Sequence, residues 1–258
     1  RTSRTMTTAS AAPNRPTIAL AMGDPAGISS ELAARVLALP EVRAAASIVV
    51  FGDRRVLEEG ARVAGLSFAA LDIAVVEDGA AVDASARPVL VDLRNLDPET
   101  VERDRPTAVG GAFAIENFRR ALLMAQAGEA DAVCFTPFNK KAMRYVYAGY
   151  DDEIRFISEV IGFQGHAREF NILGGLWNAR VTSHIPLSAV AAAITEEGIL
   201  AELALTDRSL RAAGFENPRI AVAGLNPHGG DGGNFGDEEI RIIGPAVQAG
   251  VARGFNVS

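Results

Sequence analysis

His184 and His228 are the side chains of this sequence best suited to hold a metal ion. Each follows an apolar, β-branched segment, Arg180–Ser183 for the first and Arg219–Ala223 for the second. Imidazole is the commonest ligand of borderline divalent metals, and open parallel α/β sheets bind ligands beyond the carboxyl ends of their strands. The pattern predicts that the two rings converge on one ion. The alternative, which position alone leaves open, is that each ring only bonds to backbone in a tight turn.

A glycine-rich loop surrounds the second histidine, with the sequence Asn226-Pro-His-Gly-Gly-Asp-Gly-Gly-Asn-Phe-Gly236. Glycine lets backbone amides approach a ligand closely, so the loop and Asn226 are candidate substrate contacts, with a flexible surface loop as the alternative. The loop is not a dinucleotide-binding fingerprint, because Phe235 stands where the last glycine is required. The residues that bind a cofactor therefore stay unassigned.

Two further candidates follow predicted strands nearer the start of the chain. Lys140 and Lys141 are the only lysines and come shortly after the segment that ends at Thr136, a position that suits an anionic or hydroxy-acid substrate. A solvated surface pair is the alternative. Asp24 lies between a predicted strand and a helix, where it either caps the helix or faces the ligand.

The elements that position these residues alternate between short β-branched runs and longer helical patterns, which is typical of a mostly parallel sheet flanked by helices. The predicted strands are Thr17–Met22, Ser47–Phe51, Val89–Asp92, Ala132–Phe135, Phe170–Leu173, Arg180–Ser183 and Arg219–Ala223. The predicted helices are Ser30–Leu39, Arg54–Ala64, Gly110–Ala127, Ser188–Ala213 and Asp237–Arg253. We expect a leader over residues 1–15, a first lobe over 16–135 and a second lobe over 136–258.

Composition narrows the class of function. A formal charge of −7 argues against a nucleic-acid or anionic-membrane binder, and no apolar run is long enough to span a bilayer, so small molecules are the expected partners. The single cysteine, Cys134, forms no disulfide within the chain, which suits a reducing cytoplasm. Its apolar surroundings predict that it is buried.

Four segments together resemble the 4-hydroxythreonine-4-phosphate dehydrogenase family of pyridoxal phosphate biosynthesis and its catabolic relatives. They are Met22-Gly-Asp-Pro-Ala-Gly-Ile28, Thr136-Pro-Phe-Asn-Lys140, Thr182-Ser-His-Ile-Pro-Leu187 and Gly224-Leu-Asn-Pro-His228. The resemblance implies a two-lobed α/β fold like that of isocitrate and isopropylmalate dehydrogenases. It also implies a homodimer, NAD or NADP, and a divalent cation such as Zn, Mg, Co or Mn.

The resemblance also assigns roles. His184 and His228 match two metal-binding histidines of the family, whose third lies in a later His-Asp-Gln-Gly segment without a counterpart here. The chain stops as Phe255-Asn-Val257 begins a strand, so we expect a C-terminal segment to be missing. The implied reaction oxidises a metal-bound hydroxyl by hydride transfer and decarboxylates the keto acid, with Lys140 as the catalytic side chain.

One departure from the family concerns the substrate. The family recognises phosphate with a Gly-His-Thr-Glu stretch, and here Asp151 and Asp152 stand where histidine and threonine are expected. Because like charges repel strongly in a desolvated site, we expect a hydroxy acid or cis-dihydrodiol in place of the phosphorylated amino acid, with both aspartates facing the substrate. A metal-dependent hydrolase and a truncated, non-catalytic dimerising subunit are the alternatives.

Overall fold

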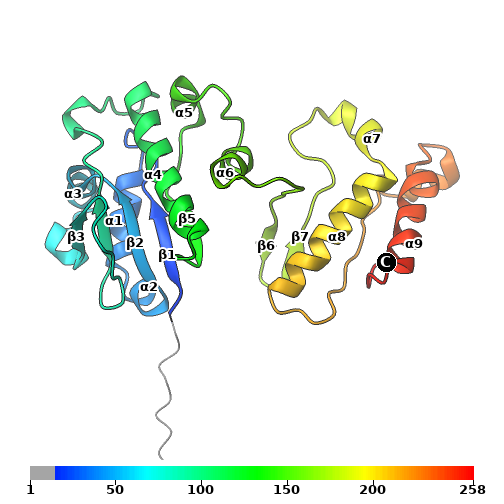
Figure 1. Cartoon of the computed structure of the whole chain (residues 1–258). Helices are drawn as coiled ribbons and strands as arrows, with labels where there is room; N and C mark the ends of the chain where they lie inside the picture. The colour runs from blue at the N-terminus through cyan, green and yellow to red at the C-terminus, as the bar shows by residue number, and fades with distance from the viewer. Residues whose placement is uncertain (1–14) are drawn as a thin grey trace, which may run out of the picture. The chain divides into compact units, whose positions relative to one another are not determined.

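The computed structural model describes residues 15–258 and divides into two compact units, one ending at Phe163 and the other spanning Gln164–Ser258 (Figure 1). The expected leader lies outside the described residues except for Arg15. The expected lobe boundary after Phe135 falls inside the first unit, where the following helices pack against the same core. The predicted lobe bounds remain a prediction.

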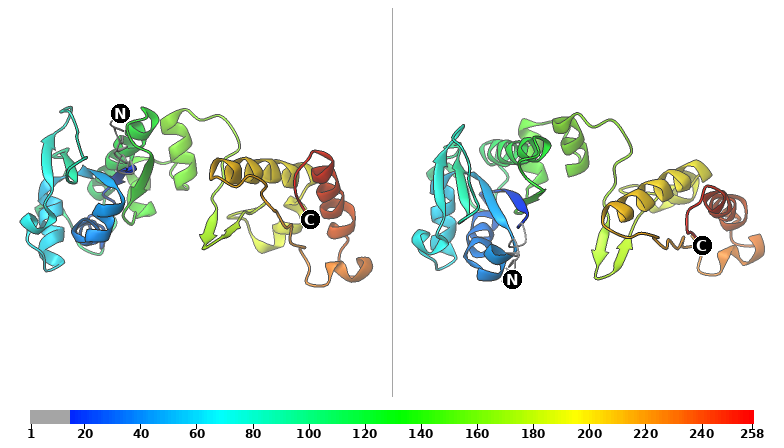
Figure 2. Two further views of the ribbon diagram at one scale, coloured as in Figure 1. Left: turned by 90° about the horizontal axis from the view of Figure 1, so that it is seen from below. Right: turned by 60° about the horizontal axis from the view of Figure 1, so that its bottom comes forward.

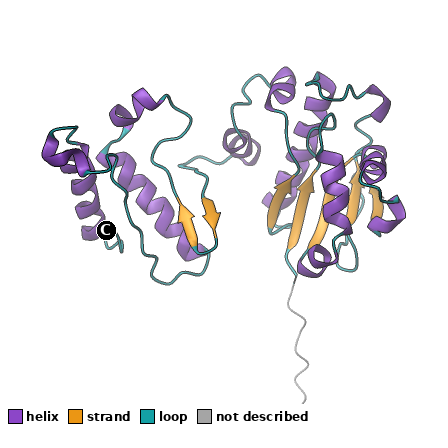
Figure 3. Ribbon diagram, turned by 180° about the vertical axis from the view of Figure 1, so that it is seen from behind, coloured by secondary structure: helices purple, strands orange, loops and turns teal. Residues whose placement is uncertain are grey.

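The first unit is built on a five-stranded parallel sheet in the order β3-β4-β2-β1-β5 (Figure 3). Its strands are β1 (Thr17–Ala21), β2 (Ser47–Gly52), β3 (Ala74–Glu77), β4 (Val89–Asp92) and β5 (Ala132–Phe135). Its helices are α1 (Ser29–Ala38), α2 (Pro40–Ala45), α3 (Arg54–Val63), α4 (Ala108–Gln126), α5 (Lys140–Val146) and α6 (Glu153–Ile161), with short 3₁₀ turns η1 (Phe68–Leu71) and η2 (Pro98–Thr100). The α/β class with a mostly parallel sheet is confirmed.

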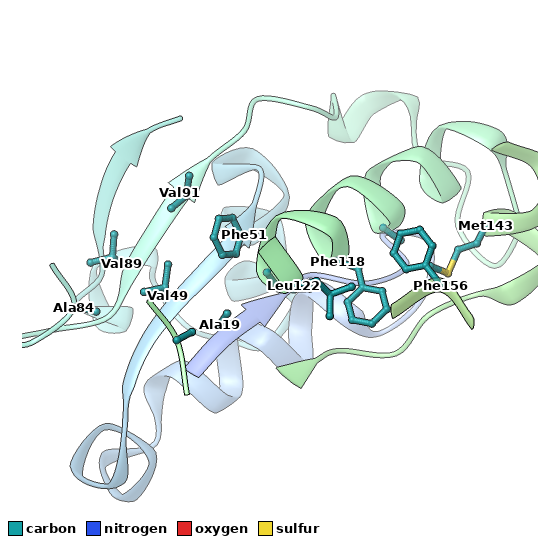
Figure 4. Close-up of a cluster of buried hydrophobic side chains, with 14 of the residues drawn as sticks. Ala19, Val49, Phe51, Ala84, Val89, Val91, Phe118, Leu122, Met143 and Phe156 are labelled. Atoms are coloured by element: carbon teal, nitrogen blue, oxygen red, sulfur yellow. The ribbon is translucent and has the colours of Figure 1, made fainter. Parts of the chain in front are cut away.

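The central strands β2 and β4 form because their β-branched residues are buried on both faces of the sheet, as parallel strands require. Side chains alternate along each strand, so Val49 and Phe51 of β2 point to one face while Ile48 and Val50 point to the other. Helices α1 and α3 cover the second face. Helix α4 covers the first, and α5 and α6 pack against α4, where Phe118 and Phe156 stack at 5.5 Å between ring centroids (Figure 4).

The second unit has a small core between two helices (Figure 2). Its elements are β6 (Asn171–Leu173), β7 (Leu176–Asn178), η3 (Leu187–Ala189), α7 (Val190–Ala193), α8 (Glu196–Ala212), η4 (Gly229–Gly233), the π-helical turn η5 (Glu239–Ile243) and α9 (Gly244–Ala252). β6 and β7 form an antiparallel hairpin. Leu203 of α8 and Ala246 of α9 lie in the core that joins the two helices, together with Val257.

Two predicted strands of the second unit are wrong. Arg180–Ser183 forms no strand, and Arg219–Ala223 forms only an isolated parallel bridge between Ile220 and Val257. The physical reason is that an extended segment becomes a strand only when a neighbour pairs with it, and neither segment has a ladder partner among residues 15–258. The Phe255–Val257 segment does begin an extended pairing, because Ser258 N donates to Ile220 O at 3.0 Å.

Two predicted helices of this unit are interrupted. The helix expected over 188–213 breaks at Thr195, whose side chain accepts a hydrogen bond from Gly198 N at 3.0 Å and so caps α8. The helix expected over 237–253 begins with the wide turn η5 before α9.

Cys134 is exposed, so the prediction that it is buried is wrong. It lies on β5, the strand at one edge of the sheet, where burial is shallow despite the apolar sequence. Apolar composition predicted burial, but whether a strand is buried depends on its position within the sheet, which tertiary pairing decides. Within the described residues no helix has the length and apolarity needed to cross a membrane.

The contact between α4 and α5 depends on Gly111, because a Cβ at this position would overlap the backbone of Ala142. We expect Gly111→Ala to lower the free energy of unfolding by about 2–3 kcal/mol through overpacking, although alanine favours a helix. Denaturant unfolding of the two proteins measures the difference. Gly27→Ala is the matched control, because its Cβ would meet no atom closer than 3.7 Å. Equal stability of the Gly111 and Gly27 variants would contradict the close-packing argument.

Candidate active site

The topology of the sheet singles out the carboxyl ends of β1 and β5. Strands β2, β4 and β3 lie on one side of β1 in the sheet, and β5, which comes last in the chain, pairs with the other side of β1. In open α/β sheets the crevice beyond such a reversal of strand order is the usual ligand site. The turn that contains Asp24 follows β1, and Lys140 follows β5, so the structure brings these two predicted segments to one place.

Direct hydrogen bonds join the two segments. Gly23 N donates to Ser29 Oγ at 2.8 Å and to Thr136 Oγ1 at 2.9 Å, and the two hydroxyls lie 2.5 Å apart. Asp24 N donates to Pro137 O at 2.8 Å. A Cβ at Gly23 would overlap the carbonyls of Thr136 and Pro137, so only glycine permits this approach. The turn after β1 is therefore fixed against the segment that leads to Lys140.

A buried amide supports the same turn from α4. Asn117, fully buried, donates from Nδ2 to Met22 O at 2.9 Å and accepts at Oδ1 from Asn95 Nδ2 at 3.0 Å. Buried polar groups need partners of this kind, and here the partner is the last residue before the turn. The support positions Asp24, whose Oδ1 accepts from Ala26 N at 3.0 Å in a local turn.

Lys140 lies at the start of α5 and is held by a carboxylate. Its Nζ lies 3.0 Å from Glu153 Oε2, and the lysine side chain is 40% exposed whereas that of Glu153 is 18% exposed. Tyr150, fully buried, points its hydroxyl at the other oxygen, Oε1, at 3.5 Å. Burial, followed by the charge of Glu153, raises the pKa of Tyr150 far above its ordinary value, so the phenol stays protonated. The ammonium thus has a fixed position and an open side.

Asp151 and Asp152, which were expected to contact the substrate, interact with Arg155 in α6 in this structure. Asp152 caps α6, accepting from Arg155 N at 2.9 Å, and Asp151 Oδ2 lies 2.6 Å from Arg155 Nη1. Both carboxylates are thus satisfied by the first turn of α6, a role that the acidic run fits well because carboxylates favour a helix N-terminus.

Asp53, at the carboxyl end of β2, is the most deeply buried carboxylate near this sheet edge. Burial alone would raise its pKa, but hydrogen bonds from the Arg55 side chain and from the backbone N–H groups of Leu96 and Arg55 outweigh it and lower the pKa. The charged carboxylate caps α3 and ties the segment after β4 to it.

The second unit carries the remaining candidates. His184 and His228 are both exposed, and His184 adopts a left-handed backbone with φ of 57°, which is uncommon for a residue other than glycine. Across residues 15–258 no three His, Cys, Asp or Glu side chains lie close enough together to hold a metal ion. Imidazole suits a borderline divalent ion, but these two rings do not form a complete site with any third side chain described.

Asn226 organises the glycine-rich loop. Its Nδ2 donates to Phe235 O at 3.1 Å, which joins the two ends of the loop, and its backbone N donates to Glu239 Oε1 at 2.6 Å, which ties the start of the loop to the turn η5. The bond from Asn226 N is the chief reason that the pKa of Glu239 is lowered. Positive φ angles at Gly230, Asp231 and Gly232 give the loop its left-handed turn. The amide of Asn226 is therefore engaged within the loop.

Sequence reasoning missed Glu153 and Asn117. Glu153 is 13 residues from Lys140, a separation that no helical or strand period marks. Asn117 lies one turn after Phe113 on the buried face of α4. A polar residue at such a position indicates a buried amide that needs a hydrogen-bond partner, and this was the signal in the sequence.

Residues 44–258 match the family described as "Pyridoxal phosphate biosynthetic protein PdxA". The chain belongs to this PdxA family. It is 61% identical, over 94% of its length and 69% of the relative, to a Rhizobium meliloti protein named "Putative 4-hydroxythreonine-4-phosphate dehydrogenase 2". It is 34% identical to a Symbiobacterium thermophilum protein named "Putative D-threonate 4-phosphate dehydrogenase", over 95% of the chain and 72% of the relative.

Solved structures agree with this membership. The crystal structure of 4-hydroxythreonine-4-phosphate dehydrogenase from Klebsiella pneumoniae superposes with a TM-score of 0.79 at 29% identity, covering 95% of this chain and 73% of that one. The resemblance expected from the four motifs is confirmed, and this member of the PdxA family is an oxidoreductase acting on CH–OH groups.

Asp53 makes the stability of the first unit depend on pH. A lowered pKa means that its stabilising contribution is complete above the ordinary value of 3.8 and is lost as the pH falls below it. We expect Asp53→Asn to lower the free energy of unfolding by about 2 kcal/mol at pH 7, and the difference from wild type to narrow as the pH falls below about 3.8. Denaturant unfolding across this range tests it. Asp78→Asn, at a surface pair with Arg120, should cost less than about 1 kcal/mol throughout. A gap that stays constant with pH would contradict the assignment.

Proposed function

We propose that the chain acts in an NAD(P)-dependent and metal-dependent dehydrogenase that oxidises a hydroxy acid or a related diol and decarboxylates the resulting keto acid. The observation that carries the proposal is the hydrogen-bonded meeting of the Asp24 turn with the Thr136–Lys140 segment at the reversal of strand order, in a chain of the PdxA family. Such an edge is where α/β enzymes bind small ligands. The homodimer expected from the family stays a prediction.

Lys140 is the side chain to which we assign the chemistry. An ammonium at the carboxyl edge of β5 attracts a substrate carboxylate and supplies a proton at Nζ, and Glu153 at 3.0 Å fixes its direction. Asp24 is proposed to contact substrate hydroxyls from the opposite side of the crevice. Asn226 is proposed to do so in the second unit through the glycine-rich loop that it closes.

His184 and His228 are proposed as two ligands of the metal. Within residues 15–258 no group of three His, Cys, Asp or Glu side chains could complete the site. When bound, a divalent cation polarises a substrate hydroxyl, and a nicotinamide ring accepts the hydride from its carbon. The exposure of both imidazoles leaves them accessible for coordination.

The proposed substrate is a hydroxy acid other than 4-phosphohydroxythreonine. Asp151 and Asp152 are both engaged by the first turn of α6, so their charge alone does not exclude a phosphate. Support comes from the Symbiobacterium thermophilum relative named for D-threonate 4-phosphate, which is a hydroxy acid without an amino group.

The test is reduction of NAD or NADP by the chain with Zn²⁺, Co²⁺, Mg²⁺ or Mn²⁺ present. D-threonate 4-phosphate, 4-phosphohydroxythreonine and a cis-dihydrodiol are compared as substrates. We expect turnover with the phosphorylated acid or the diol to exceed turnover with the amino acid by at least about 10-fold, a 1.4 kcal/mol preference. Faster turnover of 4-phosphohydroxythreonine would overturn the substrate proposal. Absence of reduced nucleotide with every substrate would overturn the dehydrogenase proposal.

The same assay tests the role of Lys140. Lys140→Met is expected to reduce kcat/KM by about 100-fold, the usual scale for loss of a positioned acid or base. Lys141→Met, which removes the exposed neighbouring ammonium, should stay within about threefold of wild type. Similar activities of the two variants would remove Lys140 from the mechanism.

Metal binding is measured directly by calorimetry with Co²⁺ or Zn²⁺. We expect His184→Asn and His228→Asn each to weaken binding by at least about 10-fold, because each removes one ligand. Asparagine tolerates the left-handed backbone at position 184, which keeps the fold intact. His166→Asn is the control, since that imidazole instead contacts the buried Glu202 at 3.0 Å. If the control loses metal as strongly as the other two, the assignment of His184 and His228 fails.

A further inference from the structure

A pocket with a volume of about 40 Å³ lies in the first unit, at the sheet edge opposite to the candidate active site. Its lining includes Arg15 directly ahead of β1, Arg43 in α2 ahead of β2, and Arg87 ahead of β4. The remaining lining residues are Ala46, Asp72, Ala84, Ala86 and Pro88. Because β1, β2 and β4 are parallel and adjacent, these three arginines converge at the amino ends of their strands.

Two of the arginines are held in place by backbone carbonyls. Arg43 donates from Nε to Leu37 O at 2.7 Å and from Nη2 to the carbonyls of Ala70 and Leu71. Arg15 donates from Nη1 to Arg43 O at 2.8 Å and from Nη2 to Ser85 O. These bonds leave Nη1 of Arg43 and Nε of Arg15 as the nitrogen atoms that make no hydrogen bond to these carbonyls, so the side chains are oriented before any ligand arrives.

The charges in the pocket are not balanced. Asp72 is the one acidic residue in its lining, and it lies only loosely against the arginines, 3.5 Å from Arg43 Nη1 and 3.9 Å from Arg87 Nη1. Arg87 makes no closer ion pair within residues 15–258, and its side chain is 55% exposed. Three guanidinium groups and one carboxylate leave two positive charges here, in a chain with a formal charge of −7.

We propose that this pocket binds a phosphate group, either inorganic phosphate or the phosphate of a small monoester. Guanidinium groups match the geometry and charge of phosphate oxygens, and a dianion would neutralise the two excess charges. The volume exceeds that needed for a single water and fits one compact oxyanion, not a nucleotide. Nε of Arg15, Nη1 of Arg43 and the guanidinium of Arg87 supply the donors, while Asp72 opposes the anion.

The pocket is separate from the proposed catalytic crevice. Strand β1 runs from beside Arg15 to the turn that holds Asp24, and five residues of strand separate the two edges by about 16 Å. A bound anion would link the chain before β1, helix α2 and the segment before β4. We therefore expect it to stabilise the first unit, and the site does not depend on the proposed dehydrogenase activity.

The experiment is calorimetric titration of the whole chain with inorganic phosphate at pH 7.5, at constant ionic strength set with chloride. We expect Arg87→Gln to weaken binding by at least about fivefold and Asp72→Asn to tighten it by about threefold, because one loses a donor and the other loses the opposing charge. Arg241→Gln, which removes an exposed arginine of the second unit, should bind phosphate as wild type does. Thermal unfolding of each variant without phosphate checks that the fold is retained.

The two opposite shifts decide the matter. Phosphate binding that is unchanged in both pocket variants, or that weakens in Asp72→Asn, would overturn the proposal. Binding of chloride as strong as the binding of phosphate would overturn it too. A second titration with glycerol phosphate separates the possible sources of the group. Binding at least as tight as that of inorganic phosphate supports a monoester ligand, and much weaker binding supports the free ion.

Discussion

The close approach of the turn after β1 to the segment after β5 is the constraint on which the first unit depends. A single backbone N–H, that of Gly23, meets two buried hydroxyls, and the next N–H pairs with Pro137 O. These bonds satisfy polar groups that strand geometry leaves unpaired at the end of β1. Because a side chain at Gly23 would occupy the same space as two carbonyls, this approach of the two segments is possible only with glycine there.

The rest of the unit is arranged to hold that approach rigid. Both sheet faces are filled with alternating apolar side chains, and α4 supplies Asn117 to the end of β1 while its glycine lets α5 lie close. Lys140 begins α5, so the packing of α4 on α5 determines where its ammonium lies relative to the sheet edge. A lysine on a helix fixed by core contacts is positioned more precisely than one on a free loop.

The two edges of the sheet have different chemistry for the same topological reason. Parallel strands place all their carboxyl ends on one edge, which gathers the turns and helix starts that carry Asp24, Lys140 and Glu153. Their amino ends gather on the other, where three arginines from separate segments meet although they are far apart in sequence. One sheet thus presents polar and charged side chains at the carboxyl ends of its strands and a cationic pocket at their amino ends.

The sequence by itself determined the α/β class, the strands β1, β2, β4 and β5, the helices α1, α3 and α4, and membership in the PdxA family. Local periodicity and short motifs encode these features, because they arise from neighbours along the chain. Tertiary structure alone decided that Cys134 lies on an exposed edge strand and that Glu153 holds Lys140. It also decided that the segments before His184 and His228 are not laddered strands. In each case the outcome depends on which distant segment lies alongside, and pairing across the fold leaves no period in the sequence.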